Sequence, residues 1–310
     1  MIEYSHLNLR RITITNNIEN FLTSIKCIYK LNEPLSKHTT LGIGGNANYF
    51  VEIETENQLI SLLKFINENK IKFFVIGGGS NILFGDEEFK GIVIKLSGDF
   101  CKYKIAENIV DCGAAVSLAF LAKQTAERGL SGLEYLAAIP GTVGGAVFGN
   151  AGVKICSISS IIDKVELVDY CGNKKVLTKD DIKFEYRKSN LVGNIITKAF
   201  FILKNADKND ILKTISNEFE RRRNSQPIGT KNAGCVFKNP KDDSAGRLID
   251  SLNLKNYSIG EIQISDVHAN FFINKNNGCA RDMISLIEFV KNEVYKKYNI
   301  KLETEIKIIK

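Results

Sequence analysis

The chain has 310 residues, of which 44% are hydrophobic and 25% charged, a composition typical of a soluble protein with two or three domains. No long apolar run occurs and the N-terminus lacks an apolar core segment, so neither a membrane-spanning helix nor a signal peptide is expected. The net charge of +7 comes from scattered basic residues, and their one cluster, 221–223, lacks interleaved aromatic residues, which argues against binding of nucleic acid.

Apolar spacing predicts alternating strands and helices in the first part of the chain. Strands are expected at 49–53, 73–76 and 92–96, with an amphipathic helix at 57–70 between the first two. This order resembles a crossover unit. Ile82, however, stands where the third glycine of a dinucleotide-binding GxGxxG turn would be, so a Rossmann fold is only weakly indicated.

The same patterns continue to the C-terminus. Further helices are predicted at 116–128, 209–223, 245–252 and 283–294, and further strands at 165–168, 195–203, 269–273 and 302–309. Gly129 is placed to end the helix at 116–128, and a domain boundary is expected near Asn205. This order indicates an α+β protein with two cofactor-binding lobes and a third, C-terminal lobe.

Two segments are unusually rich in glycine. One is Gly77-Gly78-Gly79-Ser80-Asn81, and the other is IPGTVGGAVFGNAG at 139–152. Glycine inside a helix or strand costs about 0.5–1 kcal/mol relative to alanine, so we expect these glycines to let the backbone approach a bulky polar group. Backbone amides at such turns suit phosphate, and the pair indicates a large pyrophosphate cofactor. Tight turns without a ligand are the alternative interpretation.

Three further clusters carry groups suited to chemistry. Tyr186-Arg187 lies in FEYRKSN, where the arginine either grips a carboxylate at two points or forms an exposed salt bridge. Cys235, in NAGCVFKNP, is a proton donor, a nucleophile or a buried inert thiol. Alternation puts Glu303 and Glu305 on one face of the terminal strand, which is either a solvated edge or part of a cleft.

Other common types of site are not indicated. The seven cysteines form no CxxC pair and the three histidines are far apart, so we expect neither a disulfide framework nor a metal site. The cysteine pattern fits a reducing cytoplasm. The chain also lacks a GxxxxGK[ST] segment, which argues against a P-loop.

Six motifs together carry a family resemblance. They are HTTLGIGG (38–45), VIGGGSN (75–81), GLEYLAAIPGTVGGAVFGNAG (132–152), YRKSN (186–190), AGCVFKNP (233–240) and LETEI (302–306). In this order, from about Leu31 onward, the chain resembles the UDP-N-acetylenolpyruvoylglucosamine reductases, the MurB family of flavoenzymes in peptidoglycan precursor synthesis.

The resemblance implies a particular domain arrangement. It is an α+β fold with a two-lobed FAD-binding domain of the vanillyl-alcohol-oxidase (PCMH) type and a C-terminal α+β substrate-binding domain. The implied parts are lobe 1 at 1–97, with about thirty N-terminal residues unassigned, lobe 2 at 98–205, a substrate-binding domain at 206–300 and a terminal strand at 301–310 that carries Glu305.

The resemblance also implies roles for individual residues. Arg187 matches the active-site arginine, Glu305 matches the catalytic glutamate, and Cys235 stands where the family usually has a proton-donating serine. Tyr186, Lys238 and Asn239 fall in segments that line the substrate site. The implied cofactor-binding residues are Gly77, Gly78, Gly79, Ser80, Asn81, Ile139, Pro140, Gly141, Thr142, Gly144, Gly145, Gly149 and Asn150.

The implied activity is the NADPH-driven, FAD-dependent reduction of an enolpyruvyl sugar nucleotide, with small-molecule substrates and no metal, nucleic-acid, membrane or obligate protein partner. Two departures stand out. A thiol is a stronger acid than the usual serine hydroxyl, which fits retention of the proton-donor role by Cys235. The short stretch between Lys204 and Arg221 leaves no room for the inserted tyrosine loop of one family branch, so the chain resembles the branch without it.

Two other classes of protein stay open at this point. A flavin oxidase of the same fold would explain the glycines, but it would not explain AGCVFKNP or LETEI. A colourless nucleotide-binding or nucleic-acid-binding module would explain the positive charge, and its binding would depend steeply on salt.

Overall fold

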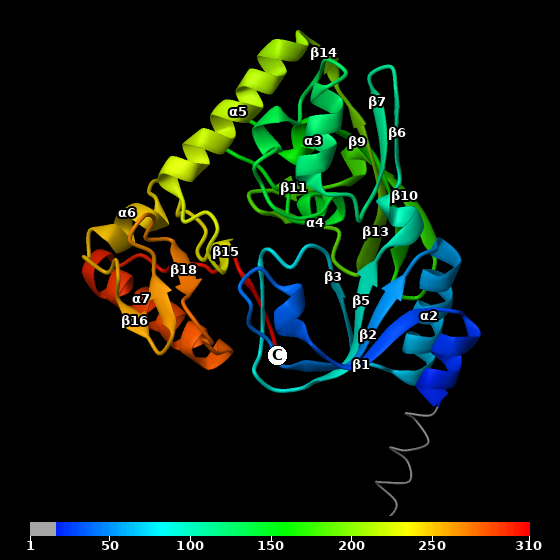
Figure 1. The fold of residues 1–310 in the computed structure, drawn as a ribbon, viewed down its shortest axis with the longest axis horizontal. Helices are drawn as coiled ribbons and strands as arrows, with labels where there is room; N and C mark the ends of the chain where they lie inside the picture. The colour runs from blue at the N-terminus through cyan, green and yellow to red at the C-terminus, as the bar shows by residue number, and fades with distance from the viewer. Residues whose placement is uncertain (1–16) are drawn as a thin grey trace, which may run out of the picture.

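The computed structural model describes residues 17–310 and contains three larger sheets (Figure 1). In the first sheet, β5 lies between β2 and β3 and runs parallel to both, while β1 pairs antiparallel with β2 at the edge. Its strands are β1 (Ile28–Pro34), β2 (Asn46–Ile53), β3 (Phe73–Ile76) and β5 (Phe89–Leu96). The helix α2 (Glu56–Asn69) connects β2 to β3, which confirms the crossover predicted for this part.

The second sheet is antiparallel throughout, in the order β10-β9-β13-β7-β6. Its strands are β6 (Tyr103–Ala106), β7 (Ile109–Gly113), β9 (Ile162–Asp169), β10 (Lys174–Thr178) and β13 (Asn194–Ile202). Beside it lie α3 (Leu118–Ala126), the short helix α4 (Val143–Phe148), the hairpin of β11 (Phe184–Glu185) with β12 (Lys188–Ser189), and the pair β8 (Leu130–Ser131) with β14 (Lys204–Asn205). The helix α3 is shorter than predicted, and Gly129 follows it with a φ of +69°.

The third sheet has the order β15-β18-β17-β16 and belongs to the C-terminal lobe. Its elements are β15 (Asn232–Cys235), β16 (Ser258–Ile259), β17 (Ile262–Ile264), β18 (Phe271–Asn274), α6 (Ala245–Asp250) and α7 (Ala280–Tyr298). The long helix α5 (Lys208–Ser225) leads from the second sheet to this lobe along one side of the molecule (Figure 1). Short 3-10 helices η1 to η5 cover Leu35–His38, Gly98–Cys101, Glu134–Leu136, Ile158–Ser160 and Lys179–Asp181.

The C-terminal segment returns to the first part of the chain. The strand β19 (Lys307–Ile309) pairs in parallel with β4 (Ile82–Phe84), next to the 77–81 loop. The single strand predicted over 302–309 is therefore too long. The residues before 307 pair instead with the segment after β15, where Phe237 and Thr304 form an isolated bridge.

The hydrophobic core crosses the boundaries between the sheets. One apolar cluster joins the first and second sheets to α2 and α3, and it includes the fully buried Leu62, Leu121 and Phe201. A second cluster surrounds α7, and it takes in Leu41 and Leu83 from the N-terminal part of the chain. Within residues 17–310, no helix has both the length and the apolar character needed to cross a bilayer.

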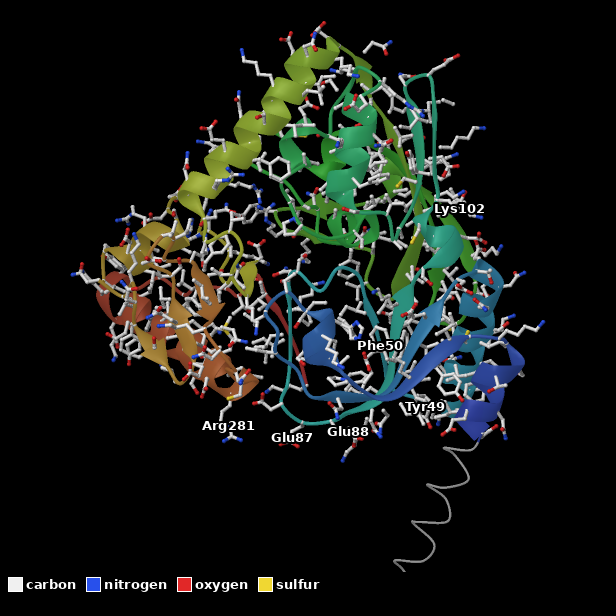
Figure 2. The ribbon with its side chains drawn as sticks, in the orientation of Figure 1. Tyr49, Phe50, Glu87, Glu88, Lys102 and Arg281 are labelled. Carbon is white, nitrogen blue, oxygen red and sulfur yellow. The ribbon has the colours of Figure 1, made fainter. Side chains whose placement is uncertain are left out.

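The C-terminal lobe is also tied to the first lobe at the start of α7. The carboxylate of Asp86 accepts hydrogen bonds from the backbone amides of Ala280, at 2.6 Å, and Arg281, at 2.9 Å. Figure 2 shows Arg281 and Glu87 on facing edges of the two lobes at this junction. Asp86 therefore satisfies amides that a helix leaves unpaired in its first turn, and its charge complements the helix dipole.

We expect Asp86→Ala to lower the free energy of unfolding by about 1 kcal/mol, because two amides lose their acceptor. Urea unfolding followed by circular dichroism measures this change. Glu87→Ala removes the neighbouring exposed carboxylate and serves as the matched control, with a change below about 0.5 kcal/mol. Equal effects of the two substitutions would show that the hydrogen bonds from Ala280 and Arg281 to Asp86 add nothing specific to the stability of the protein.

Candidate active site

A cavity of about 1280 Å³ lies where the three lobes meet. Its walls come from both glycine-rich segments, from the β11–β12 hairpin and from β15, and they also include the terminal segment. Arg187, Cys235 and Glu305, which are far apart in the sequence, all line it. This volume exceeds the usual range for a pocket that holds one small ligand, and it suits a large cofactor together with a substrate.

The two glycine-rich segments pack against each other with backbone on backbone. A Cβ atom placed on Gly78 would lie 2.9 Å from the Cα of Gly141, and the Ser80 hydroxyl donates to the Pro140 carbonyl at 3.0 Å. Gly79 has a φ of +65°, and a Cβ there would lie 1.9 Å from the His38 carbonyl oxygen. Glycine is thus required at Gly78 for the two segments to meet, and at Gly79 for the loop to pass the His38 backbone.

The two segments differ in the amides that they leave free. In the first turn of α4, the amides of Val143, Gly144 and Gly145 already bond to protein acceptors. The amides of Gly78 and Gly79, by contrast, make no hydrogen bond within residues 17–310. Unbonded amides in a glycine-rich turn are the donors that a phosphate needs, so the 77–81 loop is the better fit for a pyrophosphate group.

Most of the residues predicted to bind the cofactor line this cavity. They are Gly77, Gly78, Gly79, Ser80, Asn81, Ile139, Pro140, Gly141, Thr142, Gly144, Gly145 and Gly149. Asn150 is not among the lining residues. Its side chain instead donates to the Glu185 carbonyl at 2.9 Å and accepts from the Ser159 amide at 3.1 Å.

Arg187 and Glu305 form an ion pair inside the cavity, with Nε of the arginine 3.0 Å from a carboxylate oxygen. Arg187 is the second residue of the β11–β12 turn, with a φ of +56° that only a few percent of non-glycine residues adopt. Its two terminal nitrogens bond to no acceptor in residues 17–310 and can therefore take a ligand carboxylate. Burial raises the pKa of Glu305, although the nearby Arg187 charge opposes this shift.

Cys235 ends β15 directly after Gly234, which has a φ of +75°. Burial, followed by the negative charge of Glu305, raises the pKa of the Cys235 thiol to about 12, although the guanidinium groups of Arg187 and Arg222 act in the opposite direction. Burial therefore outweighs the basic surroundings. The thiol keeps its proton at neutral pH, as a proton donor must.

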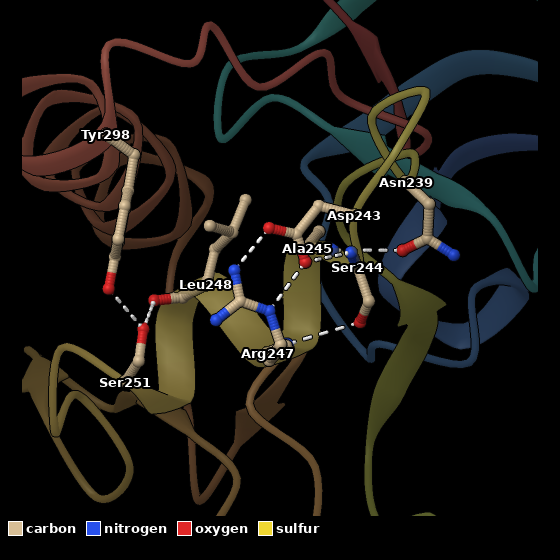
Figure 3. Close-up of polar contacts among 8 residues, drawn as sticks. All are labelled: Asn239, Asp243, Ser244, Ala245, Arg247, Leu248, Ser251 and Tyr298. Carbon is tan, nitrogen blue, oxygen red and sulfur yellow. Dashed lines mark hydrogen bonds and ion pairs between the residues drawn. The ribbon is translucent and has the colours of Figure 1, made fainter.

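The three predicted substrate-binding residues do not line the cavity. Tyr186 is 53% exposed, and Lys238 forms an ion pair with the exposed Glu303. The Asn239 side chain accepts a hydrogen bond from the Ala245 amide at 3.0 Å, in the first turn of α6 (Figure 3). Their predicted contacts with substrate stay predictions.

Several basic residues that line the cavity were not predicted from the sequence, among them Arg222 and Lys307. Arg222 donates to the Ala138 carbonyl at 3.0 Å, while its buried Nε has no partner within the described chain. Lys307 lies with its ammonium 3.9 Å from the centre of the Phe148 ring. Signals for both were present, because Arg222 lies in the 221–223 cluster and Lys307 follows Glu305 by two residues along an extended segment.

This chain is similar to known proteins along most of its length. Residues 226–309 match the family model of the UDP-N-acetylenolpyruvoylglucosamine reductase C-terminal domain, and residues 47–177 match that of an FAD binding domain. A UDP-N-acetylenolpyruvoylglucosamine reductase from Halalkalibacterium halodurans is 40% identical over 90% of this chain and 94% of its own length. The enzyme of the same name from Bacillus subtilis is 37% identical over 90% of this chain and 93% of its own length.

A solved structure gives the same result. The crystal structure of the UDP-N-acetylenolpyruvylglucosamine reductase from Thermus caldophilus superposes with a TM-score of 0.80 at 35% identity, and the match covers 92% of this chain and 99% of that one. The predicted α+β fold, an FAD-binding domain followed by a C-terminal substrate domain, is thereby confirmed. The chain belongs to the UDP-N-acetylenolpyruvoylglucosamine reductase family.

Proposed function

We propose that the chain reduces the enolpyruvyl group of UDP-N-acetylenolpyruvoylglucosamine to UDP-N-acetylmuramate, with NADPH as reductant and FAD as bound cofactor. The family membership supports this reaction over a flavin oxidase and over a nucleic-acid-binding module. The observation that carries it is the meeting of Arg187, Glu305 and Cys235 in the cavity that both glycine-rich segments line. Small molecules are its substrates, and its place is the cytoplasm, where peptidoglycan precursors are made.

The residues around the cavity fit the cofactor. The unbonded amides of Gly78 and Gly79 would hold the pyrophosphate, and the cavity is large enough for the flavin. When bound, FAD supplies hydride transfer between NADPH and C3 of the enolpyruvyl group. The protein contributes placement, charge and a proton.

Arg187 would polarise the carboxylate of the enolpyruvyl group together with Glu305, which is either protonated or shares a proton with it. Negative charge develops at C2 and spreads into this carboxylate when C3 receives the hydride. The free terminal nitrogens of Arg187 can bind the carboxylate while its Nε stays on Glu305. Positioned charge of this kind is worth about 3–4 kcal/mol per group in other enzymes.

Cys235 would donate the proton that completes the reaction at C2. Its raised pKa keeps the thiol protonated, and its place beside Arg187 and Glu305 puts it next to the carboxylate site. Each turnover would leave a thiolate at Sγ, which takes a new proton before the next one.

The purified protein should be yellow. NADPH should bleach the flavin absorbance in the absence of oxygen, and UDP-N-acetylenolpyruvoylglucosamine should restore it stoichiometrically. Stopped-flow absorbance measures both steps. A protein that is bleached by simple alcohols, or that contains no flavin when refolded with FAD, would contradict the proposed function.

Cys235→Ala should lower kcat by about 10²–10⁴-fold, the usual contribution of a positioned proton donor. Cys235→Ser should keep substantial activity, because a hydroxyl can also donate a proton. Steady-state NADPH oxidation measures both variants, and Cys101→Ala, at another cysteine that lines the cavity, is the matched control. Turnover of Cys235→Ala at the parent rate would exclude the thiol as the acid.

The raised pKa of Cys235 predicts slow alkylation. Only about one thiol in a thousand is ionised at pH 9 when the pKa is about 12, and the thiolate is the species that reacts. Inactivation by iodoacetamide should accelerate about tenfold per pH unit between pH 8 and pH 10, and bound substrate should slow it. Rapid inactivation at pH 7 that is absent in Cys235→Ser would show that the thiol is ionised.

A further inference from the structure

Two hydrogen bonds join the hairpin that carries Arg187 to residues outside it. The Asn150 side chain donates to the Glu185 carbonyl at 2.9 Å, and the Ser189 hydroxyl donates to the Phe148 carbonyl at 2.7 Å. These four residues, Phe148, Asn150, Glu185 and Ser189, form what we call the hairpin latch. They tie the end of α4 to both strands of the hairpin (Figure 1).

The Asn150 side chain contacts backbone groups of the protein and is not placed to bind a ligand. The residue is 8% exposed and does not line the cavity, and both polar atoms of its side chain are bonded to backbone groups. Its φ of +44° lies in the left-handed region, which asparagine tolerates better than most residues. The sequence resemblance placed Asn150 among the cofactor-binding residues, and the geometry points elsewhere.

The hairpin is short, and it depends on contacts with its surroundings, among them the packing of Phe184 on the core and the ion pair of Arg187 with Glu305. It contains two residues in each strand, and its turn residue Arg187 has a left-handed backbone conformation that a long side chain seldom adopts. A two-stranded hairpin of this length is not stable alone. The conformation of Arg187 therefore depends on contacts from neighbouring elements.

We propose that Asn150 is a positioning residue that acts through Arg187. By fixing the Glu185 carbonyl, it sets the start of the turn and thereby the position of the guanidinium relative to Glu305. The latch also links Arg187 to the glycine-rich segment at 139–152. The segment that lines the cofactor site and the group that binds the carboxylate are therefore structurally connected. This inference rests on the proposed function for its catalytic part, but the tie itself can be tested without activity.

The experiment compares Asn150→Gly and Asn150→Asp with the parent protein. Asn150→Gly removes both side-chain bonds and tolerates the left-handed backbone, whereas Asn150→Asp keeps the acceptor for Ser159 and loses the donor to Glu185. Asn253→Gly is the matched control, because Asn253 has a similar φ of +55° but is exposed and does not line the cavity.

The first readout needs no catalysis. The turn offers trypsin two sites, Arg187 and Lys188, and both Asn150 variants should be cut there faster than the parent and the control, as mass spectrometry of the fragments shows. The FAD affinity, measured by flavin fluorescence, should change less than about twofold. An Asn150 variant that loses FAD at least tenfold while the turn resists trypsin would overturn the proposal and make Asn150 a cofactor ligand.

The second readout separates the half-reactions. NADPH should reduce the flavin of both variants at the parent rate, whereas reoxidation by the enolpyruvyl substrate should slow about 10–100-fold, since misplacement by about 1 Å has costs of this size. In an Arg187→Ala background, Asn150→Gly should have little further effect on reoxidation. Fully multiplicative losses would show that Asn150 does not act through Arg187. If the enolpyruvyl substrate does not reoxidise the parent protein at all, the proposed function is refuted. The proteolysis result would still show whether Asn150 holds the hairpin in place.

Discussion

The active site depends on one extended segment that is hydrogen-bonded on both sides. The backbone amide of Glu305 donates to Val236 at 2.8 Å, next to the predicted proton donor, while the Asn81 side chain donates to the Glu305 carbonyl at 3.2 Å. The segment thus joins the C-terminal lobe to the loop with the free amides. These hydrogen bonds hold the backbone of Glu305 on both sides of the segment. Its side chain therefore points into the cavity, beside Arg187.

Two opposing electrostatic effects meet in this cavity. The positive charge of Arg187 favours the ionised form of both Cys235 and Glu305, whereas burial favours the neutral form, and burial prevails for both. A site of this kind can present a cationic group to a carboxylate and still keep a proton ready for transfer. The Cys235 thiol therefore keeps its proton although two guanidinium groups lie near it.

Much of the fold and site could be predicted from the sequence because the signals are local. The periodic apolar residues of α2 and α7 predicted these helices, and six ordered motifs identified the family. Pairing between distant segments had no such signal. The change of partner within 302–309, the use of Asn239 to cap α6 and the bonds of Asn150 all depend on which backbone groups come within reach after folding. The spacing of Lys307 from Glu305 was a signal, but only the change of pairing partner at residue 307 settles which way such a residue faces.

The contact between Asn81 and Glu305 spans 224 positions of the chain. A ribosome therefore completes the glycine-rich loops, both flavin lobes and the hairpin well before it delivers the glutamate. Domains formed early in translation can fold before later ones emerge. A nascent chain can accordingly fold the lobes that carry the glycine-rich loops before Cys235 and Glu305 are made, and the site is complete only when the last lobe docks.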